Sequence, residues 1–211
     1  MPRVRKELLD AAAELSRRDR ALGSVIASVG PPDLRRSRPR RTHFAELARA
    51  VYYQQLAGSA ARAIHGRFEE LLDGDPTAEA VLAVGPTRLR AVGLSGSKAR
   101  TISDLASHVV SGEVELDRVA RLSDEQIVRE LTAVWGIGRW TAEMFLIFQL
   151  GRLDVWPVGD YGVRKGYASV HRLADIPSAR ELEPLGDPYR PYRSVAAWYS
   201  WRAVDTVLPT G

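Results

Sequence analysis

Apolar residues recur every three or four positions along most of this chain, which is the period of an amphipathic helix. Over residues 4–16 the pattern is set by Leu8, Leu9, Ala12 and Leu15. No stretch alternates polar and apolar residues as a half-buried strand would, and no internal repeat is present. The pattern predicts an all-α protein. Further helices are expected over residues 19–29, 42–51, 59–72, 86–89, 99–109, 123–136, 139–150, 161–170 and 191–207.

Residues typical of helix ends sharpen several of these boundaries. Ser123 followed by Gln126 forms a capping-box pattern at the start of one helix. Asp75 before Pro76 predicts another start, because proline is favoured at the first helical position. Gly136 is placed to end the helix that begins after Ser123.

Two of the predicted helices are joined by Gly136-Ile137-Gly138 and should form a helical hairpin. Glycine tolerates positive φ and has no Cβ, so the backbone N–H groups of this turn could face a phosphate. Such a site would hold nucleic acid without reading its sequence. By itself the pattern favours a plain helix–helix turn, because glycine is the usual residue after a helix C-terminus.

The composition narrows the class of protein. The 211 residues suffice for one domain with a sizeable core or for two closely packed lobes. A net charge of +4 is compatible with a polyanionic partner. The absence of cysteine excludes disulfides, thiolate zinc sites and a cysteine-ligated iron–sulfur cluster. The four histidines lack ligand spacing, so no catalytic transition metal is expected.

The chain also carries no sign of membrane insertion or export. No apolar run approaches the roughly 18 residues of a membrane span, and the first ten residues lack a signal-peptide core. We therefore expect a cytoplasmic protein of bacterial type, associated with the nucleoid.

The hairpin belongs to a wider pattern. The spacing LxxxxGIGxxTA, followed about twenty residues later by Pro157-Val158-Gly159-Asp160, resembles the helix-hairpin-helix DNA glycosylase superfamily. The segment GIGRWTA is most similar to the 3-methyladenine DNA glycosylase II branch, and the resemblance runs from about Asp19 to Asp205. One departure is Trp135, where the family often has proline.

The resemblance implies a particular architecture. It is a two-lobed helical bundle with the active-site cleft between the lobes. One glycosylase domain would span residues 1–211, with the hairpin and catalytic loop at about 123–166. The N-terminal β domain of some relatives is not expected here, because too few residues precede Asp19.

By this resemblance, Asp160 is the catalytic residue. Cleavage of an N-glycosidic bond develops positive charge on the sugar, which an ionised carboxylate stabilises. The same carboxylate can orient or deprotonate the attacking water. Asp160 also suits a plain N-cap of the following helix, and the two roles are compatible. Asp154 is close in sequence but does not match the motif.

The resemblance also implies a DNA-binding surface, in which Leu56 acts as a wedge where the target nucleotide leaves the duplex. A core position for Leu56, an N-cap role for Ser95 and solvated positions for the cations are the structural alternatives. The predicted DNA contacts are Gln55, Leu56, Ser95, Lys98, Gly136, Ile137, Gly138, Arg139, Thr141, Arg164 and Lys165.

Aromatic residues are expected to line the base pocket. The predicted residues are Trp140, Met144, Trp201 and Tyr53. An electron-rich ring attracts a cationic alkylated purine, although a tryptophan in the core is the common alternative. Relatives that also nick DNA place a lysine nucleophile at the position of Trp140, so its absence predicts a monofunctional enzyme.

No cofactor is required by this chemistry. Hairpins of this superfamily often hold Na⁺ or K⁺ through backbone carbonyls, which here would be those of Thr132, Val134 and Ile137. The expected partner is double-stranded DNA containing damaged bases, bound by a monomer. Two other functions stay open: a glycosylase of the same fold for uracil or deaminated bases, and a non-catalytic protein that binds damaged DNA.

Overall fold

The computed structural model describes residues 2–34, 42–53, 58–74 and 76–204, which contain eleven α-helices, short 3-10 and π-helical turns and no strand. The all-α prediction is therefore confirmed. The chain divides into two compact units, each of which is described by itself. Unit 1 comprises Met1–Arg36 and Leu146–Thr210, and unit 2 comprises Ser37–Phe145. Two units agree with the two lobes that the resemblance implies, while a cleft between them stays a prediction.

Unit 1 is built from both ends of the chain. Its helices are α1 (Pro2–Arg18), α2 (Arg20–Val29), α9 (Tyr161–His171), α10 (Ala179–Leu185) and α11 (Arg193–Ala203). Asp19 caps α2, and its second oxygen accepts a 2.6 Å hydrogen bond from the Tyr189 hydroxyl. Helix α11 is buried along nearly its whole length, which makes it the centre of this unit.

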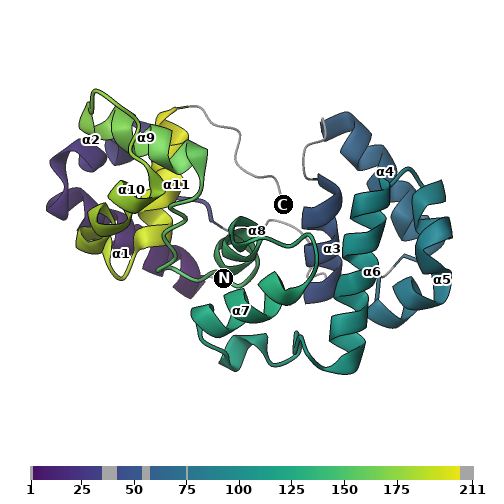
Figure 1. Cartoon of the computed structure of the whole chain (residues 1–211). Coiled ribbons are helices and arrows are strands. Elements are labelled where there is room, and N and C mark those ends of the chain that lie inside the picture. Colours follow the sequence, from purple (N-terminus) through teal and green to yellow (C-terminus); the bar gives the residue numbers. More distant parts are fainter. Residues whose placement is uncertain (1, 35–41, 54–57, 75, 205–211) are drawn as a thin grey trace. The chain divides into compact units, whose positions relative to one another are not determined.

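Unit 2 holds the central part of the chain, including the hairpin. Its helices are α3 (His43–Tyr53), α4 (Gly58–Leu71), α5 (Ala78–Ala91), α6 (Gly96–Ser111), α7 (Asp124–Ala133) and α8 (Arg139–Met144). A short 3-10 turn, Val119–Arg121, precedes α7. Helix α6 packs against both α3 and α5 (Figure 1). Buried residues on α6, among them Ile102 and Leu105, form the middle of this core.

Most predicted boundaries agree with the structure to within a few residues, and one start is wrong. Helix α7 begins with the capping box of Ser123 and Gln126, as expected. The helix predicted at Asp75-Pro76 starts instead at Ala78, because the Thr77 hydroxyl accepts the N–H of Ala80 and caps the helix there. Asp75 itself lies outside the described residues.

The second helix of the hairpin also differs from the prediction. It was expected to be one α-helix over residues 139–150, but after α8 the chain continues as a π-helical turn over Phe145–Gln149. Gly151 then adopts a φ of 68° and ends the element.

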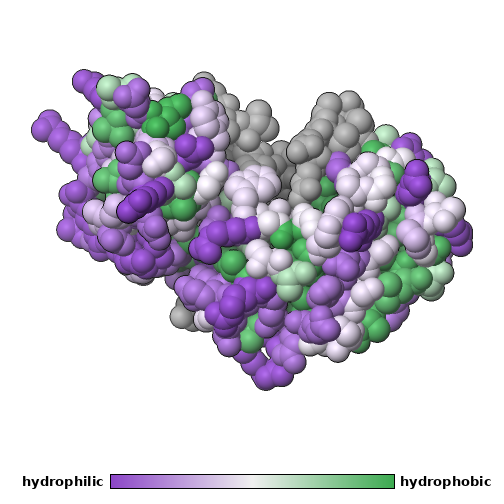
Figure 2. All heavy atoms as spheres, in the orientation of Figure 1, coloured by the Kyte–Doolittle hydropathy of each residue, from purple (hydrophilic) through white to green (hydrophobic). Residues whose placement is uncertain are grey.

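One face of the molecule shows how polar and apolar side chains are distributed. On the face shown in Figure 2, hydrophilic side chains cover much of both units and apolar residues form separate small groups. Every helix in the described ranges is either too short or too polar to traverse a lipid bilayer.

Candidate active site

Asp160 lies at the N-terminus of α9, where the sequence places it. Its backbone is extended, and its Oδ1 accepts the N–H of Val163 at 2.8 Å, which is the geometry of an N-cap. Only 7% of the residue is exposed. The positive end of the α9 dipole favours a negative charge at this position, so the cap and an ionised carboxylate support one another.

A second donor fixes the same oxygen. The indole Nε1–H of Trp201, on α11, donates to Asp160 Oδ1 at 2.8 Å. Trp201 is 1% exposed, and its ring stacks on Phe148 with centroids 5.7 Å apart. The structure thus gives Trp201 the role of orienting the carboxylate. Its role in the base pocket stays a prediction.

The loop that leads to Asp160 is held against α11 by Ser194. The Ser194 hydroxyl donates to the carbonyl of Arg152 at 2.7 Å and accepts the N–H of Val155 at 2.9 Å. Further along, the indole of Trp156 donates to the carbonyl of Leu182 at 3.0 Å. These bonds, which are buried or partly buried, hold the segment before Asp160 in place, and none of them is apparent from spacing in the sequence.

Asp154 has a structural role in this loop. Its carboxylate accepts from Arg193 at 2.7 and 3.0 Å and from Arg190 at 3.0 Å. A carboxylate held by two guanidinium groups has little freedom to turn toward a substrate. Asp160 is therefore the better catalytic candidate of the two.

Helices α9 and α11 are in tight contact at Gly166. A Cβ at this residue would lie 1.9 Å from the carbonyl oxygen of Ser200, so only glycine allows the observed packing. Since Asp160 and Trp201 belong to these two helices, this contact helps to set their separation.

Arg164 and Lys165, both predicted DNA contacts, lie on the first turns of α9. Arg164 Nη1 donates to the carbonyl of Pro177 at 3.2 Å, and its guanidinium lies 5.6 Å from the centre of the Tyr161 ring. Lys165 is exposed. Tyr161, 59% exposed directly after Asp160, was not singled out from the sequence.

The hairpin turn in unit 2 needs glycine at one position only. Gly136 has a φ of 84°, and a Cβ there would lie 2.2 Å from Thr101 Oγ1 on α6. Gly138 has a φ of −89° and open space where a Cβ would be. Ile137 is buried, and its N–H donates to the carbonyl of Val134 at 3.1 Å.

The residues after the turn differ in accessibility. Arg139 is largely exposed and pairs with the buried Glu143 at 2.9 Å. Thr141 and Met144 are buried, whereas Trp140 is 39% exposed. Trp140 is therefore partly accessible to a ligand, whereas Met144 is 7% exposed.

Three of the predicted site residues have side chains outside the part of the chain that the structure describes. Gln55 and Leu56 lie outside the described residues, and so does the side chain of Tyr53. Asp160 and Trp201 belong to unit 1, whereas Trp140 and Met144 belong to unit 2.

Ser95 and Lys98 stabilise helix ends in unit 2. The Ser95 hydroxyl accepts the N–H of Lys98 and caps α6. The Lys98 ammonium donates to the carbonyl of Tyr52 at 2.9 Å, near the C-terminus of α3, and burial lowers the pKa of this lysine below its usual value. The N-cap interpretation of Ser95 is confirmed. The DNA contacts of both residues stay predictions.

The carbonyls of Thr132 and Val134, two of the three predicted to hold a monovalent cation, lie at the end of α7. Helix α7 ends at Ala133, so the carbonyl of Thr132 lies at its last turn. The carbonyl of Val134, at the C-cap, accepts the N–H of Ile137 at 3.1 Å. The cation site stays a prediction. Among the described residues, no group of three or more His, Asp or Glu side chains suits a metal ion.

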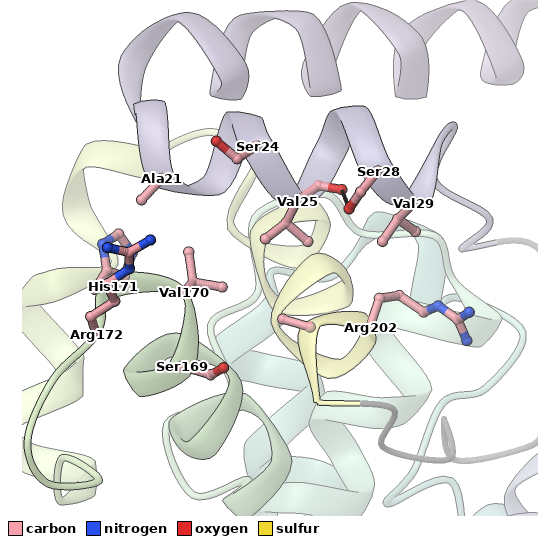
Figure 3. Close-up of a pocket in the computed structure, with 11 residues that line it drawn as sticks. Ala21, Ser24, Val25, Ser28, Val29, Ser169, Val170, His171, Arg172 and Arg202 are labelled. Atoms are coloured by element: carbon pink, nitrogen blue, oxygen red, sulfur yellow. Dashed lines mark hydrogen bonds between the residues drawn. The ribbon is translucent and has the colours of Figure 1, made fainter.

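Unit 1 also contains a pocket of about 530 Å³ between α2 and the C-terminal ends of α9 and α11 (Figure 3). Val25, Val29 and Val170 form its apolar part, and Arg172 and Arg202 lie at its sides. It lies at the opposite end of α9 from Asp160, and none of the predicted site residues lines it.

A sequence profile of the HhH-GPD superfamily of base excision DNA repair proteins matches residues 48–191, which is more than half of the chain. The match includes the hairpin and Asp160. The chain belongs to this superfamily. Because it has no cysteine, it cannot carry the cysteine-ligated iron–sulfur cluster of some HhH-GPD members.

The similar HhH-GPD proteins include DNA-3-methyladenine glycosylase 1 of Schizosaccharomyces pombe, which is 37% identical over 92% of this chain and 87% of its own. A structure of the 3-methyladenine DNA glycosylase of this yeast in complex with abasic DNA superimposes with a TM-score of 0.77 at 35% identity, covering 96% and 99% of the two chains.

A crystal structure of DNA-3-methyladenine glycosidase from Bacillus halodurans has the same fold. It superimposes with a TM-score of 0.83 at 33% identity and covers 93% of this chain and 89% of its own. The predicted HhH-GPD fold is thereby confirmed.

Proposed function

We propose that the protein is a DNA glycosylase that flips alkylated purines of the 3-methyladenine type out of double-stranded DNA and hydrolyses their N-glycosidic bond. The carboxylate of Asp160 carries the proposal, because it is buried at the N-cap of α9 and oriented by the indole of Trp201. The substrate class is supported by the similar glycosylases from yeast and Bacillus.

The chemistry needs one ionised carboxylate. The N-glycosidic bond breaks with its electron pair going to the departing base, and the sugar becomes oxocarbenium-like. Asp160 stabilises this charge at close range in a site that excludes most water. Water then adds to C1′ and loses its proton to the carboxylate or to solvent, which leaves an abasic site.

The preference for alkylated purines follows from charge. A purine alkylated on a ring nitrogen is cationic, so it leaves as a neutral base and needs no dedicated general acid. Trp140 is 39% exposed, and an indole face in contact with such a cation would contribute about 0.5–2 kcal/mol.

The enzyme should release the base without cutting the strand. Strand cleavage by related enzymes requires an amine nucleophile in the second hairpin helix, and the matching residue here is Trp140. A Na⁺ or K⁺ ion at the hairpin would be held by the carbonyls of Thr132, Val134 and Ile137 and would add charge attraction toward a DNA phosphate.

The proposal is tested by measuring base release from methylated duplex DNA with the wild type and Asp160→Asn. Asparagine caps helices about as well as aspartate, and its amide oxygen can accept the bonds from Val163 and Trp201. The variant should keep its fold and lose activity by at least about 100-fold, as expected for loss of a central electrostatic group.

The exposed Asp175, also in unit 1, provides a control of equal charge change. Asp175→Asn should leave base release unchanged. Equal activity of Asp160→Asn and the wild type would reject the assigned carboxylate. Release of uracil but not of methylated purines would reject the substrate class, and strand cleavage by the purified enzyme would reject the monofunctional assignment.

A further inference from the structure

Helix α6 contacts the hairpin turn through three residues on one face. Thr101 packs directly against Gly136, leaving no room for a Cβ there. Asp104 Oδ2 accepts the backbone N–H of Trp135 at 2.7 Å. The guanidinium of Arg100 lies over the Trp135 ring, 4.1 Å from its centre. Residues 100, 101 and 104 share a helix face, so this side of α6 is fixed against the turn.

Trp135 is an unusual residue for this position. It immediately precedes the first glycine of the hairpin and is 41% exposed. A large aromatic residue left in water on a nucleic-acid-binding turn needs a reason, and here its ring supports an arginine. The backbone N–H of Trp135 donates to Asp104, which holds the main chain that carries this ring.

Arg100 is exposed, and its side chain makes no hydrogen bond or ion pair within the described part of the chain. Stacking engages the flat face of a guanidinium and leaves its N–H edge directed sideways, where it can donate two parallel bonds to phosphate oxygens. Because the stack already restricts the side chain, less conformational entropy is lost when those bonds form.

A second cation, Lys98, lies on the same helix as Arg100 but has a different partner. Lys98 lies two residues earlier on α6, and its ammonium is directed to the carbonyl of Tyr52 on α3. Two residues along a helix correspond to about 200° of rotation, so Lys98 and Arg100 lie on opposite sides of α6. Of these two cations, Arg100 is the one beside the hairpin turn.

We propose that Arg100, stacked on Trp135, binds a backbone phosphate of the DNA next to the phosphate held by the hairpin. This inference rests on the proposed function, because it takes DNA to be the ligand of the hairpin. It adds a side-chain contact to a turn that otherwise presents backbone groups. The contact is independent of base sequence and should strengthen binding to every duplex equally.

The test is the salt dependence of binding to a duplex with a tetrahydrofuran abasic-site analogue, measured by fluorescence anisotropy between about 50 and 200 mM NaCl. For Arg100→Gln, the logarithm of the association constant should fall less steeply with the logarithm of the salt concentration, with a slope shallower by about 0.9. The affinity near 0.1 M salt should fall about five- to tenfold. Arg100→Lys should keep the slope, and Trp135→Leu should keep it with an affinity loss of about two- to fivefold.

Arg88→Gln supplies the matched control, because Arg88 is exposed on α5 and the change removes the same charge. Its slope should equal that of the wild type. An unchanged slope for Arg100→Gln, or an equal change in both glutamine variants, would overturn the proposal. Melting temperatures of all variants show whether they are folded. Failure of the wild type to release methylated bases would reject the proposed enzyme activity instead, without altering the slope comparison.

Discussion

Replacement of Trp201 by phenylalanine separates the orientation of Asp160 from the stability of unit 1. The change removes the indole N–H that donates to Asp160 Oδ1 at 2.8 Å and keeps an aromatic ring next to Phe148. A buried hydrogen bond to a charged acceptor contributes about 1.5–3 kcal/mol. If the whole contribution is lost in the transition state, base release slows by about 10- to 150-fold.

A second buried indole in the same unit provides the control. Trp156 is 6% exposed and donates to the carbonyl of Leu182 at 3.0 Å, so Trp156→Phe also removes one buried N–H bond. Because this acceptor is neutral, the expected loss of stability is about 0.5–1.5 kcal/mol. Both variants should be less stable than the wild type, but only Trp201→Phe should release base slowly once folded.

The assay combines urea unfolding with single-turnover base release from methylated duplex DNA, at a temperature where both variants are fully folded. Single-turnover conditions isolate the chemical step from product release. If Trp201→Phe and Trp156→Phe release base at the same rate, the bond to Asp160 does not orient the carboxylate for catalysis, and the reasoning is refuted.

Two further predictions concern the hairpin and the core. Gly136→Ala should lower the free energy of unfolding by about 2–4 kcal/mol and weaken DNA binding, since Gly136 combines a positive φ with contact to Thr101. Gly138→Ala should change the free energy of unfolding by no more than about 0.5 kcal/mol, and equal urea midpoints for the two variants would contradict the structure. Burial raises the pKa of Tyr199 to about 12, so its neutral form stabilises the fold fully below pH 10, and that stability is lost as pH rises toward 12. The free energy of unfolding of Tyr199→Phe, measured by urea titration at each pH, should therefore fall less steeply between pH 10 and about 12 than that of the wild type. An equal fall in both proteins would count against the burial of this hydroxyl.

Features that depend on a few neighbouring residues could be predicted from the sequence. The capping box of Ser123 and the N-cap geometry of Asp160 involve residues only three positions apart, and both are present. The helix start at Asp75-Pro76 failed for a local reason as well. Two capping candidates compete within three residues, and the Thr77 hydroxyl forms the cap that is observed.

Contacts between distant segments could not be predicted in this way. The bond from Trp201 to Asp160 joins residues 41 positions apart, and the bond from Trp135 to Asp104 joins residues 31 apart. Hydrophobic spacing places each residue on a helix but does not say which helices meet. The π-helical turn at Phe145–Gln149 could not be predicted, because apolar residues at helical spacing indicate a helix without specifying which backbone groups are bonded.

The division of unit 1 between the two ends of the chain has a consequence for synthesis on the ribosome. Helices α1 and α2 emerge first, but α9 and α11, against which α2 packs, are translated after the whole of unit 2. Unit 2 is continuous in sequence, so its core can form before translation ends. Helices α1 and α2 can pack only after their partners, more than 100 residues later, have been translated. The carboxylate of Asp160 and its indole partner Trp201 are therefore assembled last.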